Sequence, residues 1–360
     1  MKARTVAVLQ MRFTCYSFYL LLGRPFFTTH RPSRKHTTPP RVGTRSRMAS
    51  HSRSVASVPH RAAPPAPTVA FLFTLRRDRH PLGRAWNAFF RTCPKGTARV
   101  HVHTDPNFKP RSTGNRTLGG QGAFTDAVIP TPKVHIARFG YSMVQGRLNL
   151  MRYASTVSPP ADWFLFFSES DAPLRSCPDA MRYLAKHAGS SFAYSDHTPT
   201  ERLQAGARGW EQTFRTACPL CAAANISAAT YRHGPGWVGL HRAHALPIMR
   251  REQAHEPAFA EGYDWKLLGV PDEWYWTTLV EALGRRADHI LTYMEPGSAE
   301  TGHSKTFHEE DLPRLVAKAR STPPSFFARK FPTTPQMDEA LVRSLVSMRF
   351  PSRDATREPA

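Results

Sequence analysis

The segment that most constrains the fold is residues 162–167, with the sequence DWFLFF. It is the most hydrophobic strand-like run in the chain, and an unbroken apolar run is typical of a strand buried on both faces, as in a parallel sheet. Polar residues follow at once, in the order Ser168-Glu169-Ser170-Asp171. Because open α/β sheets bind ligands beyond the carboxyl ends of their strands, the sequence indicates a binding site directly after residue 167.

The elements around this segment alternate between strand and helix. The run at 68–75 predicts a first strand, residues 83–91 a short helix and residues 98–103 a second strand, which together form a βαβ unit. Further short strands are expected near 128–129, 134–136, 191–194, 234–240 and 289–293, and further helices near 142–155, 178–187, 241–252, 271–284 and 309–319. This alternation predicts one α/β domain over residues 68–335, with a mixed, mostly parallel sheet flanked by helices. A C-terminal helix and polar tail are expected over 336–360.

The N-terminus allows two interpretations. Residues 1–27 form a candidate signal anchor, because 5–22 are mostly apolar and long enough to cross a bilayer; Arg12 near the middle would cost about 3 kcal/mol on insertion. Residues 28–67 are rich in Pro, Ser and Arg and hold no acidic residue, which predicts a disordered basic stem. The same composition is typical of a cleaved organelle transit peptide, and both alternatives stay open.

The net charge of +22 is concentrated at this end of the chain. Residues 1–67 hold 12 Lys and Arg and no acidic residue, so the other 293 residues carry only about +10. A basic tail on a moderately basic domain, without a zinc-finger, helix-turn-helix or RNA-binding motif, argues against nucleic acid as the partner.

Cysteine usage fits an oxidising compartment. Cys15 lies in the N-terminal apolar stretch, and the other four cysteines could form two bridges of open pairing: they are Cys93, Cys177, Cys218 and Cys221. The Cys218-Pro219-Leu220-Cys221 motif could also be half of a redox or zinc site, but no second C-x-x-C pair exists and a structural role is favoured. Sequons at Asn115 and Asn225 predict a glycoprotein if the chain enters the secretory pathway.

A helix start stands out at Pro271. Proline suits the first turn, where its missing N–H is not needed, and Asp272 and Glu273 complement the positive end of the helix dipole. Apolar residues at helical spacing continue to a stop at Gly284. Glu273 is therefore expected to be an ionised carboxylate at a helix start, and by itself it could be no more than a first-turn acid.

Seven motifs occur in a fixed order along the chain. They are the strand at 69–74, VHTDP at 102–106, RFGYSMV at 138–144, FFSESDAPL at 166–174, GWVGL at 236–240, PDE at 271–273 and FARKF at 327–331. In this order, over residues 68–335, they resemble the core-2/I-branching glycosyltransferase family, especially its plant and algal branch-domain members. The resemblance implies a GT-A-like fold, a UDP-sugar donor, a glycan acceptor and a type II membrane protein of the Golgi.

The resemblance also assigns roles to residues. Transfer with inversion needs a base for the acceptor hydroxyl, and Glu273 matches the family's catalytic glutamate. Charge on the leaving diphosphate must be met by a metal or by fixed cations, and Lys330 matches the family's diphosphate lysine, so no metal cofactor is expected. Lys305 is the best candidate for a second cation, which is an arginine in the family; lysine meets phosphate as a point charge rather than as a fork.

Other candidates carry structural alternatives. Asp105 matches the family's uridine-contacting aspartate, although an aspartate before Pro106 could simply cap a turn. Glu169 and Asp171 could hold Mg²⁺ or Mn²⁺ as an acid-x-acid pair, but the resemblance favours a metal-free site with Asp171 structural or close to the donor sugar.

Two tryptophans, Trp237 and Trp210, could stack on acceptor sugars, although a tryptophan on a strand is more often part of the core. The sequence thus predicts an inverting glycosyltransferase that moves a sugar from a UDP-sugar to a glycan or glycoconjugate hydroxyl, by hexosyl, acetylglucosaminyl or pentosyl transfer. The alternative is a catalytically inactive glycan-binding or scaffold protein of the same fold.

Overall fold

The computed structural model describes residues 66–76, 80–108, 122–124, 127–137, 140–194, 207–222, 226–260, 270–284, 289–297 and 304–347. The expected anchor and most of the stem, both sequon asparagines and the end of the polar tail lie outside these residues. Within the described ranges, no helix combines the length and the apolarity needed to cross a bilayer.

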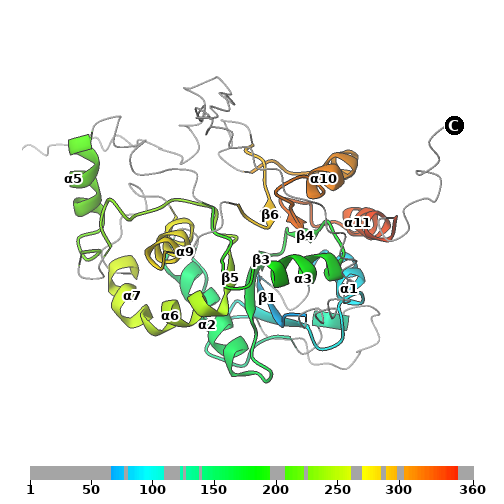
Figure 1. The fold of residues 1–360 in the computed structure, drawn as a ribbon, viewed down its shortest axis with the longest axis horizontal. Helices are drawn as coiled ribbons and strands as arrows, with labels where there is room; N and C mark the ends of the chain where they lie inside the picture. Colours follow the sequence, from blue (N-terminus) through cyan, green and yellow to red (C-terminus); the bar gives the residue numbers. More distant parts are fainter. Residues whose placement is uncertain are drawn as a thin grey trace, which may run out of the picture.

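The larger sheet has four strands in the order β2-β1-β3-β5. They are β1 (Val69–Leu75), β2 (Ala98–Thr104), β3 (Trp163–Ser168) and β5 (Gly239–His241). β1 is parallel to both β2 and β3, whereas β5 is antiparallel to β3. The mixed, mostly parallel sheet flanked by helices is therefore confirmed (Figure 1). Thr74 is paired with His103 on one side and with Ser168 on the other, so the three parallel strands end at one edge.

Alternate residues of the central strands enter two separate cores. Val69, Phe71 and Phe73 of β1 belong to one cluster, while Ala70 and Leu72 belong to the other. The first core is covered by α1 (Gly83–Phe90), α3 (Cys177–Lys186), α10 (Leu312–Ala319) and α11 (Pro335–Ser347). The second is covered by α2 (Ser142–Thr156), α5 (Ala207–Ala217), α6 (Arg242–Arg250), α7 (Glu252–Ala260) and α9 (Pro271–Ala282).

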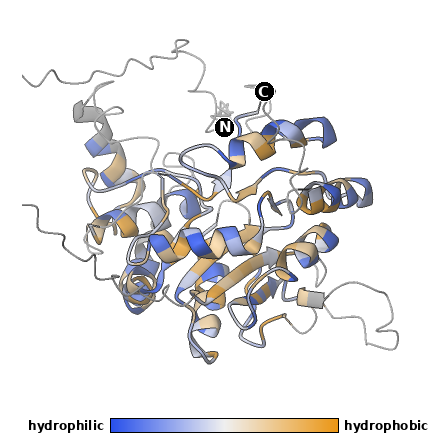
Figure 2. Ribbon diagram, turned by 45° about the vertical axis from the view of Figure 1, so that its right-hand side comes forward, coloured by the Kyte–Doolittle hydropathy of each residue, from blue (hydrophilic) through white to orange (hydrophobic). Residues whose placement is uncertain are grey.

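This double covering explains the unbroken apolar strands. A strand with one face in water would alternate polar and apolar residues, whereas β1 and β3 have helices on both faces. Figure 1 shows the two groups of helices on opposite sides of the sheet. In Figure 2, hydrophobic colours mark the central strands, whereas blue lies mainly on the surrounding helices.

A second, three-stranded sheet lies beyond the end of β3. Its order is β4-β7-β6, formed by β4 (Ala172–Pro173), β7 (Phe327–Ala328) and β6 (Thr292–Tyr293). β7 is antiparallel to β4 and parallel to β6. Two 3₁₀ turns, η1 (Gly122–Phe124) and η2 (Glu309–Asp311), complete the described elements. Because β4 begins four residues after β3, the polar turn at 168–171 is held between the two sheets.

Several expected elements are shorter or absent. Residues 128–129 and 191–194 contribute only the isolated bridges Val102–Val128 and Phe192–Gly239. No ladder forms at 134–136, because the Val134 N–H is bound by the ring of His103 rather than by a neighbouring strand. The helix expected over 241–252 ends at Arg250, and α7 begins at Glu252. The segment 309–319 begins as η2 and becomes α-helical at Leu312.

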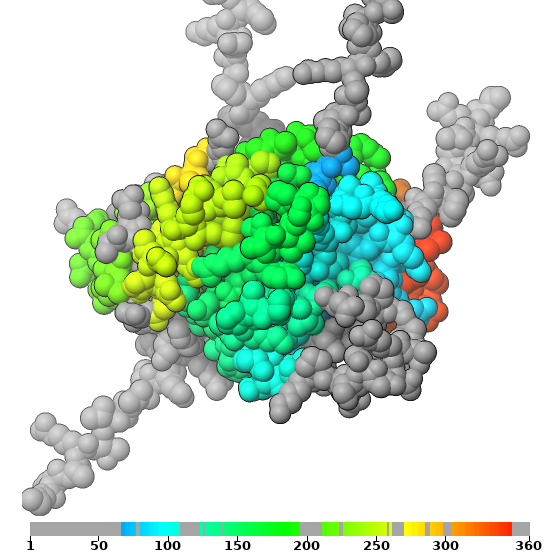
Figure 3. Space-filling model, turned by 90° about the horizontal axis from the view of Figure 1, so that it is seen from below, coloured from blue at the N-terminus to red at the C-terminus, as the bar shows by residue number. Residues whose placement is uncertain are grey.

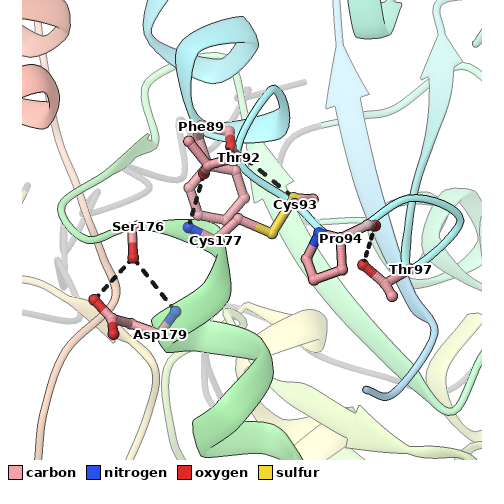
Figure 4. The surroundings of a disulfide bond; sticks show 8 residues. All are labelled: Phe89, Thr92, Cys93, Pro94, Thr97, Ser176, Cys177 and Asp179. Carbon is pink, nitrogen blue, oxygen red and sulfur yellow. Dashed lines mark hydrogen bonds between the residues drawn. A yellow bond between two sulfur atoms is a disulfide. The ribbon is translucent and has the colours of Figure 1, made fainter. Parts of the chain in front are cut away.

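The disulfide Cys93–Cys177 joins the end of α1 to the first residue of α3 (Figure 4). It closes a loop of 84 residues in sequence, which by a chain-entropy model stabilises the fold by about 4–5 kcal/mol. Thr92 Oγ accepts a hydrogen bond from the Cys177 N–H beside the bridge. Cys218 and Cys221 are bonded to each other at the end of α5, so this structure gives them the structural role rather than a zinc site.

The C-terminal helix α11 packs against α1, and Figure 3 shows it in red beside the cyan N-terminal part of the domain. The residue before α1, Leu82, offers no side-chain cap. The carboxylate of Asp338 supplies one from α11: it accepts hydrogen bonds from the Arg84 N–H at 3.1 Å and the Ala85 N–H at 2.8 Å. Met337, Ala340, Leu341 and Leu345 of α11 enter the same core as β1. α11 is thus part of the packed domain.

Replacing Asp338 by alanine should lower the free energy of unfolding by about 1–2 kcal/mol, because two N–H groups at the start of α1 lose their acceptor. Denaturant unfolding of the purified domain measures this loss. Glu339→Ala is the matched control, since Glu339 is 54% exposed and makes only ion pairs of 3.9 Å. That control should change stability by less than about 0.5 kcal/mol. Equal effects of the two variants would contradict the capping role.

Candidate active site

The candidate site lies at the edge where β1, β2 and β3 end. Asp105 follows β2 directly, and the turn 168–171 follows β3. β1 lies between them, so the two segments are about 10 Å apart at two strand spacings. His80 lines this edge: its Nδ1 accepts from the Leu82 N–H at 3.1 Å, and its Nε2–H donates to the Ser168 carbonyl at 3.1 Å. The sequence correctly placed Asp105 and the turn 168–171 at the carboxyl edge of the sheet.

Asp171 is fully buried at the centre of this turn. Its Oδ2 accepts from the Ser168 N–H, from Ser168 Oγ at 2.7 Å and from the Trp237 indole N–H at 3.1 Å. Its Oδ1 lies 3.6 Å from Nε of Arg329. Burial raises the pKa of Asp171, and the Arg329 guanidinium and the Ser168 donors oppose that rise. These contacts make Asp171 a residue that fixes its neighbours.

Trp237 and Arg329 form a stacked pair above Asp171. The Arg329 guanidinium carbon lies 3.3 Å from the centre of the indole ring. A second guanidinium, that of Arg147, lies 5.7 Å from the ring centre. The face of Trp237 that Arg329 covers cannot stack on a sugar, so the geometry favours a positioning role over the expected acceptor platform. Trp210 lies on α5, at the periphery in Figure 1, and its side chain is outside what the structure describes.

Arg147 connects the Trp237 loop to the start of α9. Its Nη1 lies 2.9 Å from the Gly236 carbonyl and 2.9 Å from Oδ2 of Asp272. Both side chains are buried, with exposed fractions of 9% and 3%. Burial raises the pKa of Asp272, and the nearby Arg147 charge opposes that rise.

Glu273 follows Asp272 in the first turn of α9, but it points elsewhere. Its side chain is 23% exposed, and its Oε2 lies 3.2 Å from Nε2 of His233. The loop carrying His233 is fixed to the helix start, because the Gly234 N–H donates to the Glu273 carbonyl at 2.9 Å. Of the two acids that begin α9, Glu273 is thus the one that solvent can reach.

The two expected diphosphate lysines are backbone neighbours. The Lys330 N–H lies 3.4 Å from the Lys305 carbonyl, and the Phe307 N–H donates to the Lys330 carbonyl at 2.7 Å. Lys305 is held by carboxylates, with Asp311 Oδ1 at 3.0 Å and Glu295 Oε2 at 3.8 Å. Within the described ranges, the Lys330 ammonium has no carboxylate partner. The structure therefore brings the two cations together but leaves only one of them uncompensated.

Asp105 forms the turn that the sequence suggested as its structural alternative, and its contact with uridine stays a prediction. Its Oδ1 accepts from the Asn107 N–H at 2.8 Å, and its Oδ2 lies 2.8 Å from Nδ1 of His135. The Asn107 N–H lowers the pKa of Asp105, and His135 adds to this effect. The carboxylate stays about one-third exposed, so it remains open to a ligand.

Both carboxylates of the acid-x-acid pair, Glu169 and Asp171, contact protein groups. Glu169 lies 3.5 Å from Nε of Arg76, while the donors around Asp171 take up its carboxylate. Among the residues that the structure describes, no group of three or more His, Cys, Asp or Glu side chains could hold a metal ion.

Several residues of this site were not identified from the sequence, among them Arg147, Arg329 and His233. Arg147 could have been found from the sequence, because it lies among the apolar positions Val144, Leu148 and Met151 of α2. An arginine on the buried face of a helix predicts a buried acidic partner. Arg329 precedes Lys330 in the FARKF motif. No local pattern could have identified His233, since its partner Glu273 is 40 residues away in the sequence.

Comparison with known proteins identifies one family. The model described as "Branch: Core-2/I-Branching enzyme" matches residues 69–319, which is more than half of the chain. No curated protein matches the chain. The matched range contains every motif noted above except FARKF, and it ends with the last residue of α10, before β7 and α11.

His80 and the two buried histidines of β2, His101 and His103, should make the fold sensitive to acid. Burial lowers the pKa of His80 to about 3, and burial together with nearby cations lowers the pKa of His101 and His103 to about 4. As the pH falls below 6.5, the unfolded chain binds protons that the folded chain does not, so stability is lost between pH 6.5 and about 4.

His101→Gln isolates one of these contributions. Between pH 7 and pH 5, the variant should lose about 1–2 kcal/mol less unfolding free energy than the wild type, because glutamine does not titrate. Denaturant unfolding at the two pH values measures the difference. The same pH dependence in variant and wild type would show that His101 is protonated in the folded state.

Proposed function

The chain belongs to the core-2/I-branching enzyme family, a family of glycosyltransferases, and on that premise we propose that it is an inverting transferase that uses a UDP-sugar. In this proposal Glu273 is the general base, Lys330 meets the charge of the leaving diphosphate, and Asp105 contacts the nucleoside. The acceptor is a hydroxyl of a glycan or glycoconjugate.

The observation that carries the proposal is the different environment of two adjacent acids. Asp272 is buried and paired with Arg147, whereas Glu273 is partly exposed beside His233. A base must be accessible to the hydroxyl whose proton it takes, and of these two acids only Glu273 is exposed to solvent. With Oε2 held near His233, its Oε1 is available to accept the proton as the hydroxyl oxygen attacks the anomeric carbon. One displacement then breaks the bond to the diphosphate and inverts the configuration.

The cations near β7 support the diphosphate assignment for Lys330. Arg329 is balanced by Asp171, and Lys305 and Arg314 together are balanced by Asp311 and Glu295, so Lys330 brings the net positive charge. Lys305 would contribute only after exchanging its carboxylates for phosphate oxygens. Preorganised positive charge at this position lowers the energy of the departing UDP. The carboxylates of Asp171 and Glu169 are engaged by protein donors, which supports a reaction without a metal ion.

Location is part of the same proposal. A transferase anchored in the Golgi membrane by residues 1–27 agrees with the two disulfides, because bridges persist in oxidising compartments. A cleaved transit peptide is the alternative, and the N-terminal residue of the mature protein distinguishes the two. The main functional alternative is an inactive glycan-binding or scaffold protein of the same fold.

A panel of UDP-sugars with glycan acceptors tests the activity. Purified protein should release UDP with at least one donor, and Glu273→Gln should lower kcat at least about 10³-fold while UDP affinity stays within about threefold. Calorimetric titration with UDP measures the affinity, and the amide keeps the shape of the side chain but cannot take the proton. Full turnover by the Gln variant would remove Glu273 as the base, and no UDP release with any donor would favour the inactive scaffold.

Lys330→Ala should weaken UDP binding by about 10- to 100-fold, because a charge-assisted contact to the diphosphate is lost. Calorimetric titration with UDP and with uridine separates the phosphate contribution, since uridine affinity should not change. Lys186→Ala, an exposed lysine of α3, is the matched control and should bind UDP as the wild type does. Unchanged UDP affinity in the Lys330 variant would assign the diphosphate to other cations.

A further inference from the structure

We infer that Arg147 is a positioning residue for transfer: it fixes the first turn of α9, and with it Glu273, against the loop that carries Trp237. This inference rests on the proposed function, because it concerns the placement of the proposed base. Among the described contacts, none joins Arg147 to Glu273 or to the proposed donor residues Asp105 and Lys330, so Arg147 acts through Asp272 and Gly236.

One nitrogen of Arg147 serves two segments that are far apart in sequence. Nη1 lies 2.9 Å from the Gly236 carbonyl and 2.9 Å from the Asp272 carboxylate, while the guanidinium carbon lies 5.3 Å from the ring centre of Phe166 on β3. The arginine comes from α2, which packs on the strands of the large sheet. It therefore holds the loop and the helix start to a rigid part of the fold.

The fit at Gly236 shows how close this contact is. A Cβ atom at that position would lie 2.5 Å from Oδ2 of Asp272 and 2.9 Å from Nη1 of Arg147. Both distances are below those that real Cβ atoms show, so a larger residue at 236 would have to displace the carboxylate and the guanidinium from each other or from the loop. The loop cannot move toward α9, and the Arg147 contact prevents it from moving away.

The same contact links the proposed base to the proposed diphosphate cation. Trp237 follows Gly236, and its indole N–H donates to Asp171, whose other oxygen faces Arg329 beside Lys330. The sequence of contacts from Asp272 through Arg147, Trp237 and Asp171 to Arg329 thus spans the site. An inverting displacement needs the base and the leaving group at a fixed separation, and misplacement by about 1 Å can cost 10²-fold in rate.

Variants of Arg147 can show whether its effect on kcat is independent of its effect on the stability of the fold. Arg147→Met leaves the buried Asp272 carboxylate without its counter-charge and should lower the thermal midpoint. Combining it with Asp272→Asn removes the unpaired charge, so the thermal midpoint should recover toward that of the wild type. The kcat of the double variant should stay at least about tenfold low with UDP affinity within about threefold, because neither replacement restores the guanidinium bridge.

Gly236→Ala keeps both charges and tests the geometry alone. The added methyl must displace the Asp272 carboxylate, so kcat should fall about tenfold or more while UDP affinity is retained. Gly83→Ala is the matched control, since a Cβ there meets no atom within 4 Å, and its kcat should equal that of the wild type. This variant decides the inference if Arg147→Met does not fold.

The outcomes separate the inference from the proposed function. If the wild type releases no UDP with any donor, the proposed function fails and the inference fails with it. If the wild type is active but the double variant recovers kcat together with its thermal midpoint, Arg147 is only structural. Wild-type kcat in Gly236→Ala would likewise overturn the inference, whereas low kcat with intact UDP affinity in both variants supports it.

Discussion

Burial of β1 and β3 on both faces is the constraint on which the rest of the structure depends. Each strand sends alternate residues into two different cores, so the chain must supply helices for both sides of the sheet. One side is closed by α1, α3, α10 and α11, and the last of these even provides the cap of the first. Because both faces are occupied, ligands are left with the edge where the parallel strands end, and the polar turn after β3 lies there.

The buried carboxylates near this edge need partners of opposite charge. Burial raises the pKa of both Asp171 and Asp272, and each carboxylate meets an arginine, Arg329 and Arg147 respectively. A buried pair of this kind contributes little net stability, because desolvation offsets most of the attraction, but the loss of one partner is costly. The two pairs are therefore better understood as fixing geometry: they hold Trp237 between them, and they join α2, α9 and β7 into one rigid unit.

The sequence predicted what depends on local pattern. The apolar runs located β1 and β3, the Pro271 signal located the start of α9 within one residue, and the ordered motifs identified the family that residues 69–319 match. It could not predict contacts between distant segments. Whether Trp237 offers a free face depends on Arg329, 92 positions later. Lys305 shares the carboxylates of Glu295 and Asp311 with Arg314, a pairing that no local pattern shows. The strand expected at 134–136 does not form for a similar reason: the ring of His103, on β2, accepts the hydrogen bond of the Val134 N–H in place of a neighbouring strand.

The pattern of compensated charge also bears on whether the fold is catalytic. Among the described residues at this edge, Asp171, Asp272 and Lys305 have partners of opposite charge, whereas Lys330 has none and Glu273 faces a histidine. In the described part of the chain no ion pair joins Lys330 to Glu273, and the contacts through Trp237 hold their backbones in place. In the proposed reaction, the carboxylate of Glu273 would take the hydroxyl proton, and the separate charge of Lys330 would meet the leaving diphosphate.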